Sequence, residues 1–250
     1  MSLIAIKNVW KSYDEKTVLE NLNFTIERNE FVTIVGASGC GKTTFLRMIL
    51  GEEGPSRGNI EIDGEKLIAE PGKDRGVVFQ RYSVFPHLTV LQNVLLGLEF
   101  ASAKILCHST GSTRKQQIQR CEEMLDRVGL LSSADEYPDA LSGGMQQRLA
   151  LSQALVVEPK ILLLDEPFGA LDPGIRSDMQ ALVKELHREL GLTVLMVTHD
   201  ISEGFSLGTR VLVFDKTRMD PHEPDLFGSN ITYDILVGSG QKEQQLAMNM

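Results

Sequence analysis

The stretch of this chain best suited to chemistry is rich in glycine and ends in a lysine and two threonines. It fits the pattern G-x-x-x-x-G-K-[ST] of the Walker A phosphate-binding loop, and its residues are Gly36, Ala37, Ser38, Gly39, Cys40, Gly41, Lys42, Thr43 and Thr44. The glycines allow a tight turn that brings backbone N–H groups against phosphate oxygens. Lys42 supplies a positive charge for the β- and γ-phosphates, and the Thr43 hydroxyl is suited to Mg²⁺. We therefore predict a binding site for a nucleoside triphosphate.

Such a loop needs a strand before it and a helix after it. Phe31 to Val35 is a short apolar, β-branched run, which predicts a buried strand. Phe45 to Leu50 predicts a helix that ends at Gly51, a residue that readily takes the left-handed conformation of a helix C-terminus. The alternative is an ordinary glycine-rich turn between a strand and a helix, which does not require the full pattern.

Two adjacent carboxylates form a second candidate site. Asp165 and Glu166 follow the apolar run Ile161 to Leu164, which predicts a buried strand and matches the Walker B pattern. Beside a phosphate loop, the first carboxylate anchors the hydration shell of Mg²⁺ and the second orients the attacking water. The alternative interpretation is two solvated acids at the end of a strand.

Three single residues are further candidates. Gln80 follows the predicted strand 76–79 and can offer its amide oxygen to Mg²⁺, although it could equally be an ordinary loop residue. His199 follows the predicted strand 193–197, at the edge where open α/β sheets bind ligands, whereas a lone histidine is more often structural. Tyr13 can stack on adenine, or it can be an ordinary exposed tyrosine of a strand pair.

A second glycine pair opens a predicted helix. Residues 88–157 have a helical pattern, and near their end the chain reads Leu141-Ser142-Gly143-Gly144-Met145-Gln146. Ser142 followed by two glycines makes a helix N-terminus suited to an anion. A plain N-cap is the alternative, but a double glycine is more than a cap requires.

These elements predict an α/β fold. We expect a P-loop NTPase (RecA-like) core with an N-terminal antiparallel β region, because residues 4–9 and 22–26 alternate as strands do around a polar turn. The helical stretch is then an inserted α-helical subdomain. The predicted organisation is a core of residues 1–87 and 158–219, a helical subdomain of residues 88–157, and a C-terminal extension or tail of residues 220–250, polar and mobile from Gly238.

Composition limits the classes of partner. The formal net charge of −9 argues against a broad nucleic-acid surface, so no nucleic-acid partner is expected. The three cysteines form no C-x-x-C pair, which indicates a reducing compartment. We expect no signal peptide, and no stretch approaches the roughly 20 apolar residues of a membrane-spanning helix. A membrane role would therefore require a partner.

Taken together, these motifs resemble the ATP-binding cassette (ABC) family, the nucleotide-binding subunits of ABC transporters, over about residues 4–214. The discriminating element is Leu141 to Gln146, which matches the family signature L-S-G-G-x-Q. The resemblance identifies Gln80 as the Q-loop, Ala170-Leu171-Asp172 as the D-loop, His199 as the switch histidine and Tyr13 as the adenine-stacking aromatic residue.

The resemblance implies a head-to-tail homodimer that encloses two ATP molecules with Mg²⁺. The phosphate loop of one subunit then faces Ser142, Gly143 and Gly144 of the other, and Asp172 is a further nucleotide-site residue. Glu166 polarises the attacking water, and His199 holds the γ-phosphate. Asp165 holds Mg²⁺ largely through water, with Thr43 and Gln80 as direct ligands. Lys42, Gln80, Glu166 and His199 are the expected catalytic residues.

The resemblance also favours an importer. Phe-Gly-Ala-Leu-Asp, with Gly169 where the D-loop often has serine, is common among importer subunits. Residues 78–90 are similar to the nitrate/sulfonate/taurine (bicarbonate) group, and residues 209–227 to subunits that accompany urea or guanidine-type carboxylase systems. The chain ends soon after its last predicted strand, so we expect it to lack the long regulatory domain of sugar-importer ATPases. Non-transport ABC ATPases of repair or translation, and P-loop kinases, are the alternatives.

An importer subunit implies two protein partners. We expect a peripheral protein at the cytoplasmic face of the cell membrane, which contacts an integral-membrane permease through Gln80 to Leu91 and a solute-binding protein indirectly. That segment groups Tyr82, Phe85 and Leu88 around a proline, and exposed apolar groups of this kind often mark a partner site. The alternative is that they pack under the helical block as part of its core.

Overall fold

The computed structural model describes residues 2–80, 84–102, 112–218, 220, 222–223 and 225–238. The chain forms two compact units. The first unit comprises Met1–Gly72 and His187–Met250, and the second unit comprises Lys73–Leu186.

The first unit contains most of the strands. Its elements are β1 (Ser2–Tyr13), β2 (Lys16–Glu27), β3 (Phe31–Val35), α1 (Lys42–Leu50), β4 (Arg57–Ile62), β5 (Glu65–Lys66), β8 (Thr193–Thr198), α6 (Ile201–Leu207), β9 (Arg210–Asp215) and β10 (Asn230–Leu236). The second unit contains β6 (Arg75–Val78), α2 (Val90–Ser102), α3 (Ser112–Arg127), α4 (Gly143–Leu155), β7 (Ile161–Asp165) and most of α5 (Pro173–Leu190), with short 3₁₀ turns at Leu131–Ser133 and Pro138–Ala140. The predicted α/β fold is confirmed.

An antiparallel sheet forms the N-terminal part of the first unit, in the order β2-β1-β4-β5. β1 and β2 make a hairpin whose turn begins at Asp14, with a left-handed φ of 50°. Ile4 and Ile6 of β1 are buried while Ala5 and Lys7 are more exposed, which is the alternation expected of a sheet with one covered face, and a shift of the β1–β2 register after Ile6 makes Val9 the next buried residue. The sequence predicted this antiparallel region.

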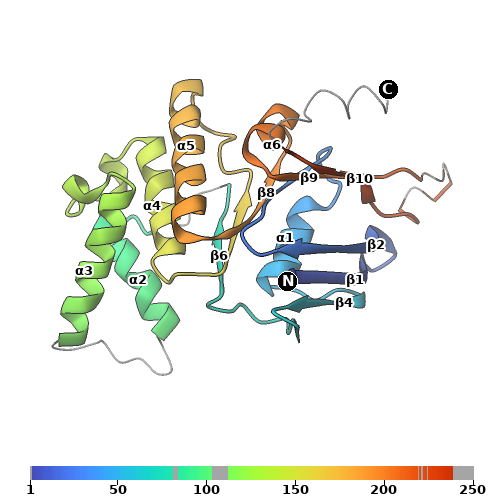
Figure 1. The fold of residues 1–250 in the computed structure, drawn as a ribbon, viewed down its shortest axis with the longest axis horizontal. Coiled ribbons are helices and arrows are strands. Elements are labelled where there is room, and N and C mark those ends of the chain that lie inside the picture. Colours follow the sequence, from blue (N-terminus) through green and yellow to red (C-terminus); the bar gives the residue numbers. More distant parts are fainter. Residues whose placement is uncertain are drawn as a thin grey trace. The chain divides into compact units, whose positions relative to one another are not determined.

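Parallel strands form the other part of the first unit, with β3 between β8 and β9. Every residue of β3 and β8 is buried, as expected of strands covered on both faces. α1 follows β3 (Figure 1), and its Phe45 packs between Phe24 and Phe214 with ring centroids 5.7 and 5.6 Å apart. The helix is therefore fixed to both sheets of the unit by aromatic packing.

The sequence analysis did not predict β10. This strand pairs antiparallel with β9 and lies within residues 220–250, which were interpreted only as an extension or tail. Its apolar residues alternate, but the prolines before it suggested a break. The bidentate ion pair of Arg210 with Asp234, at 2.6 Å, fastens the strand to β9. A pairing between segments some 20 residues apart in sequence is not visible in a local pattern. The predicted polar tail lies almost entirely outside the described residues.

The second unit combines a parallel strand pair with helices. β6 pairs with β7, and α2, α3 and α4 lie side by side (Figure 1). A Cβ at Gly76 would lie 2.8 Å from the Ala154 carbonyl oxygen, so α4 packs directly on β6. On α3, Cys121 and Leu125 are buried, as is Val128 just after the helix, and Gly129 has a φ of 71°.

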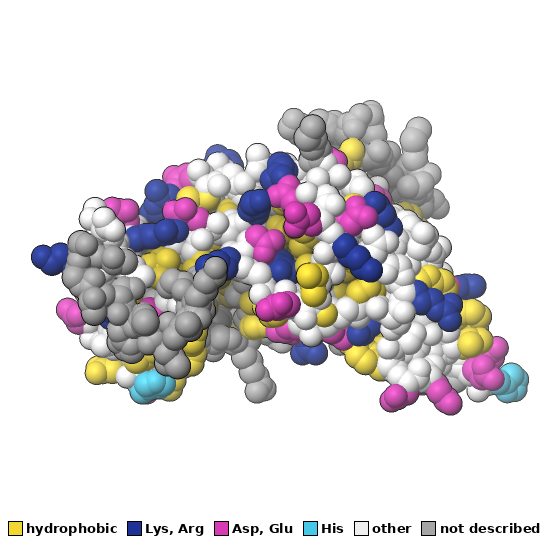
Figure 2. Space-filling model, turned by 90° about the horizontal axis from the view of Figure 1, so that it is seen from below, with side chains coloured by type: hydrophobic (Ala, Val, Ile, Leu, Met, Phe, Trp, Pro, Cys, Tyr) yellow, Lys and Arg dark blue, Asp and Glu magenta, His cyan; other side chains and the backbone are white. Residues whose placement is uncertain are grey.

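The surface carries both signs of charge. On the face drawn in Figure 2, acidic and basic side chains are interspersed over the described residues. Among the described residues, we find no helix with the length and apolar composition needed to cross a membrane.

One half-buried histidine makes the stability of the first unit depend on pH. Burial lowers the pKa of His187, whose Nε2 lies 3.1 Å from the Asn29 carbonyl oxygen and whose ring meets the edge of Phe31. A histidine with a depressed pKa contributes stability above its unfolded pKa of about 6.5, and that stability is lost as pH falls through the lower folded value.

We therefore expect the free energy of unfolding to fall more for the wild type than for His187→Gln when pH drops from about 7.5 to about 5.5. The neutral amide keeps a donor for Asn29 but does not titrate. Urea unfolding at the two pH values measures the difference. An equal pH dependence in the two proteins would contradict a depressed pKa of His187 in the folded state.

Candidate functional site

The phosphate loop lies where β3 ends and α1 begins. Gly41 is the N-cap of α1 with a φ of 88°, and Gly39 has a φ of 80°. These left-handed conformations favour glycine strongly. Gly41 provides no side-chain cap, and the first turn of α1 contains no acidic residue within the described helix. The helix N-terminus therefore presents backbone N–H groups and a positive dipole end, which suits an anion.

Two of the loop glycines are also required by packing. A Cβ at Gly36 would lie 2.3 Å from the Phe214 carbonyl oxygen of β9, and a Cβ at Gly41 would lie 2.7 Å from Leu19 Cδ2 of β2. A Cβ at Gly39 would meet nothing within 4 Å. The sequence analysis explained all three by their approach to phosphate, whereas Gly36 and Gly41 have a second reason that depends on the fold behind the loop.

The Lys42 side chain lies along the loop. Its ammonium donates to the carbonyl oxygens of Gly36 at 2.8 Å and Ala37 at 2.9 Å, and it lies 3.8 Å from Cys40 Sγ. Only 5% of Lys42 is exposed. Burial raises the pKa of the Cys40 thiol, so the thiol stays protonated at neutral pH. A bound phosphate could replace these two carbonyl oxygens as the hydrogen-bond acceptor of the Lys42 ammonium.

His199 leaves the sheet at the same edge as the phosphate loop. β3 and β8 are parallel, and Val35 is paired with Thr198, so the residues that follow both strands lie at one edge. The exposed His199 stands between two anchored residues. The Thr198 hydroxyl donates to Glu203 and accepts from the Asp200 N–H at 3.1 Å, and Asp200 caps α6. The fold thus places this histidine beside the phosphate loop.

In the second unit, parallel strand pairing likewise brings Gln80 and Glu166 together. Val78 of β6 is paired with Leu164 of β7, so the residues after these strands share an edge. The Gln80 amide donates to the Glu166 carboxylate at 3.4 Å. Glu166 has a left-handed φ of 47°, an unfavourable conformation for this residue type that is typical of functional sites. Asp165, the last residue of β7, is half-buried.

The signature segment opens α4 as predicted. The Ser142 side chain caps the helix by accepting from the Met145 N–H at 3.3 Å. A Cβ at Gly144 would lie 2.5 Å from Ile175 Cγ2 of α5, whereas a Cβ at Gly143 would meet nothing within 4 Å. Packing therefore explains Gly144, but it leaves Gly143 unexplained. Ser142 and Gly143 are both exposed, as is Asp172 immediately before α5.

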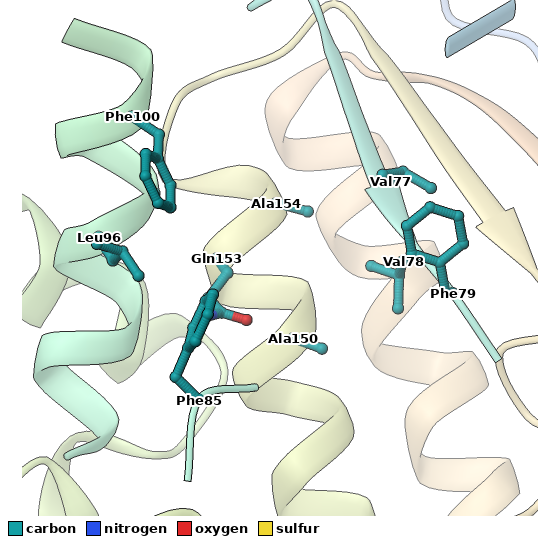
Figure 3. Close-up of a pocket in the computed structure, with 10 residues that line it drawn as sticks. Val77, Val78, Phe79, Phe85, Leu96, Phe100, Ala150, Gln153 and Ala154 are labelled. Carbon is teal, nitrogen blue, oxygen red and sulfur yellow. The ribbon is translucent and has the colours of Figure 1, made fainter. Parts of the chain in front are cut away.

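A cavity of roughly 210 Å³ lies among β6, α2 and α4 within the second unit. Figure 3 shows Leu96 and Phe100 extending from α2, with Gln153 and two alanines from α4. Phe85, from the segment predicted to contact a permease, lies beside Gln153, and it is 38% exposed. Leu88 is half-buried, and Tyr82 lies outside the described residues.

A buried asparagine holds this segment in place. Asn93 of α2 is fully buried, and its amide donates to the carbonyl oxygens of Phe85, Leu88 and Thr89 at 2.9 to 3.1 Å. Its side-chain oxygen accepts from the Phe85 N–H at 2.8 Å and from Gln153 at 3.1 Å. The sequence analysis missed Asn93. An asparagine among the apolar residues of a helix face was the available signal, because a buried amide needs partners.

A second missed residue is Gln147, which is buried on α4. Its amide donates to the carbonyl oxygen of Pro167, the residue after Glu166. α4, which begins at the signature, is therefore tied to the loop that contains Glu166. In the sequence, Gln147 is only a polar residue within a predicted helical stretch. Its burial depends on packing, which no local pattern shows.

The donor set suits Mg²⁺. The predicted ligands Thr43, Gln80 and Asp165 carry hydroxyl, amide and carboxylate oxygens, which are hard ligands of the kind that this ion prefers. Among the described residues, no three His, Cys, Asp or Glu side chains form a metal cluster.

The sequence of the chain is similar to known protein families and to individual proteins. A model of the ABC transporter family matches residues 19–169. The chain is 40% identical to the Fe(3+) ions import ATP-binding protein of Haemophilus influenzae, covering 98% of this chain and 75% of that protein. It is 42% identical to the sulfate/thiosulfate import ATP-binding protein of Rhodopseudomonas palustris, with 87% and 62% covered. It is 40% identical to the spermidine/putrescine import ATP-binding protein of Clostridium novyi, with 86% and 60% covered.

The fold of the chain is also similar to solved structures of ABC transporter cassettes. The dimeric structure of the bacterial ABC transporter cassette MJ0796 has a TM-score of 0.75 and 33% identity, covering 94% of this chain and 99% of that one. The same values hold for its post-hydrolysis state bound to ADP and Pi. The protein cbiO1 of Clostridium perfringens has a TM-score of 0.80 and 26% identity, covering 99% and 93%. The chain contains the phosphate-loop motif, the two consecutive carboxylates after β7 and the signature segment, and it belongs to the ABC transporter family and is an ATPase of that family.

Proposed function

We propose that the chain is the ATP-hydrolysing subunit of an importer, which powers the uptake of a small solute through a membrane permease. The relatives described above are import ATP-binding proteins, and the chain spans between three fifths and three quarters of their length. The contact between Gln80 and Glu166 carries the hydrolytic part of the proposal, because it joins a potential Mg²⁺ ligand to a potential water-orienting carboxylate.

The cargo class needs a correction. The sequence analysis favoured nitrate, sulfonate, taurine or urea-like solutes, whereas the relatives described above import ferric ions, sulfate or thiosulfate, and spermidine or putrescine. We therefore propose that the solute is a small ion of one of these classes. The similarity of the chain to these import subunits is what supports this choice.

The first unit supplies most of the proposed contacts to ATP. Backbone N–H groups from Gly36 to Thr44 and the Lys42 ammonium hold the phosphates, as the left-handed glycines and the start of α1 favour. Tyr13 stacks on adenine. His199 reaches the γ-phosphate from the same sheet edge as the loop. Bound Mg²⁺ neutralises phosphate charge, with Thr43 and Gln80 as direct ligands and Asp165 acting largely through water.

The second unit supplies the proposed catalytic base. Glu166 orients and polarises the attacking water, and its strained backbone conformation supports a role beyond that of a solvated acid. Phosphoryl transfer requires mainly positioning and charge stabilisation, which are the functions proposed for these side chains.

The active form is proposed to be a head-to-tail homodimer. Ser142, Gly143 and Gly144 of one subunit then face the phosphate loop of the other, with Asp172 near the same nucleotide. The exposure of Ser142 and the open space around Gly143 support this role, because packing does not require a glycine at 143.

The cavity beside Phe85 is proposed to receive the permease. Exposed Phe85 and Phe100 offer apolar contact area, and Asn93 fixes the segment that contains Phe85. The segment follows Gln80, so a permease bound there would act close to a proposed Mg²⁺ ligand. The protein would lie at the cytoplasmic face of the membrane and communicate with a solute-binding protein only through the permease.

The role of Glu166 can be tested by Glu166→Gln. We expect ATP binding to persist and turnover to fall by about a hundredfold or more, the size of a lost general base. ATP-dependent dimer should accumulate in size-exclusion chromatography. Glu65→Gln, at an exposed carboxylate of β5, is the matched control and should behave as the wild type. Turnover near wild type in Glu166→Gln would remove Glu166 from its proposed role.

The dimer can be tested by mixing two inactive variants. Ser142→Arg damages only the signature, and Lys42→Ala damages only the phosphate loop. In a head-to-tail dimer, the mixed pair contains one intact site, so mixing should restore part of the turnover that each variant lacks alone. Steady-state ATPase of the separate and mixed proteins gives the answer. If mixing restores nothing while both variants remain folded, the shared-site arrangement is wrong.

The docking surface can be tested by Phe85→Ala. We expect near-normal basal ATPase in the isolated subunit and reduced assembly with the permease, because the side chain is exposed and contributes little to the core. Ile68→Ala, at another exposed apolar residue, is the control and should leave assembly intact. Co-purification with the permease measures assembly. Unaltered co-purification of Phe85→Ala would place the permease elsewhere.

A further inference from the structure

The tyrosine proposed to stack on adenine is held by its hydroxyl group. Tyr13 is the last residue of β1, and its Oη donates to the two carboxylate oxygens of Glu53 at 2.7 and 2.6 Å. Glu53 follows α1, the helix that begins with Lys42 of the phosphate loop. A residue at the end of one strand is thus attached to the loop that leaves the nucleotide-binding helix.

A buried lysine completes the arrangement. Lys11 is only 8% exposed, and its Nζ lies 2.7 Å from Glu53 Oε2 and 2.9 Å from the Gly54 carbonyl oxygen. The same ammonium lies 4.8 Å from the centroid of the Tyr13 ring, within the range of a cation–π contact. We call Tyr13, Glu53 and Lys11 the tyrosine clamp.

The backbone around the clamp is also tied together. The Ser56 N–H donates to the Trp10 carbonyl oxygen at 2.8 Å, and the Ser12 N–H donates to Ser56 Oγ at 3.0 Å. These hydrogen bonds therefore join the end of β1 to the loop after α1. Since α1 also opens at the phosphate loop, this attachment relates the position of the Tyr13 ring to the site where phosphates bind.

Charge keeps the clamp formed at neutral pH. Burial, together with the neighbouring Glu53, raises the pKa of the Tyr13 hydroxyl, which therefore remains a donor. Burial works to raise the pKa of Glu53, but hydrogen bonds from Lys11 and Tyr13 outweigh it and lower that pKa, so the carboxylate remains an acceptor. Tyr13 is nevertheless 43% exposed, which leaves ring surface for a planar base.

We propose that Glu53 and Lys11 are positioning residues that hold the Tyr13 ring in place for the nucleotide base. They thereby determine how much of the binding free energy comes from the base rather than from the triphosphate. This proposal rests on the proposed stacking role of Tyr13. A ring that is held at its hydroxyl end and contacted by a cation loses little conformational freedom when a base stacks on it. The entropic cost of binding the base is therefore smaller.

The test compares ATP with inorganic tripolyphosphate, which lacks the base. Glu53→Gln keeps an acceptor but loses the charge, Lys11→Met keeps the apolar stem, and Tyr13→Phe keeps the ring but loses the hydroxyl. For each we expect ATP affinity to fall about fivefold, part of the value of one stacked base, with tripolyphosphate affinity unchanged. The KM for ATP should rise while kcat at saturating ATP stays near wild type, as expected for lost uniform binding.

Coupling between the residues is the sharper measurement. Because both changes release the same ring, Tyr13→Phe combined with Glu53→Gln should weaken ATP binding no more than either change alone. Glu61→Gln is the matched control. It breaks a comparable ion pair with Lys7, at 2.7 Å, in the same antiparallel sheet, and it should alter neither affinity.

The outcomes distinguish the positioning role of Glu53 and Lys11 from the stacking role of Tyr13 on which it rests. If Tyr13→Ala leaves the ATP affinity unchanged, the stacking role itself is wrong. If Tyr13→Ala weakens ATP binding but Glu53→Gln and Lys11→Met do not, only the positioning role is overturned. An equal loss of ATP and tripolyphosphate affinity in Glu53→Gln would also overturn it, because Glu53 would then support the phosphate loop and not the base.

Discussion

The structure of the first unit depends on the close approach of the phosphate loop to the strands behind it. Gly36 lies so near the Phe214 carbonyl oxygen that a Cβ would be 2.3 Å away, and a Cβ at Gly41 would lie 2.7 Å from Leu19 Cδ2. Overpacking of this kind typically costs about 1–3 kcal/mol, and here it would also displace the backbone N–H groups that face the ligand. The shape of the loop is therefore set by β2 and β9 as much as by its own glycines.

Parallel pairing then decides which side chains share an edge. The pairing of Val35 with Thr198 brings the phosphate loop and His199 together, and the pairing of Val78 with Leu164 brings Gln80 to Glu166. In both cases the chemistry follows the last residue of a strand. A shift of register by one residue would turn the strand's side chains to the other face and separate these groups.

Most of this could be predicted from sequence, because the motifs are local and their strands and helices have plain periodicity. The phosphate loop, the capping role of Ser142 and the strand before Asp165 all follow from a few neighbouring residues. β10 and the contacts of Asn93 could not be predicted, since they depend on residues distant in sequence or on burial that packing alone determines. The packing requirement for glycine at position 36 could not be predicted either, because it depends on the Phe214 carbonyl oxygen of β9.

The two units divide the proposed chemistry in a way that makes binding and hydrolysis separable. The residues that would hold the base and phosphates belong to the first unit, while Glu166 and the signature belong to the second. Removal of a carboxylate after β7 leaves every contact of the phosphate loop in place, so it should affect only the chemical step. Conversely, the tyrosine clamp contains no group that reacts. In the proposed role its contribution would be equal in the ground state and the transition state, so the clamp would set the ATP concentration at which the enzyme works and not its maximal rate.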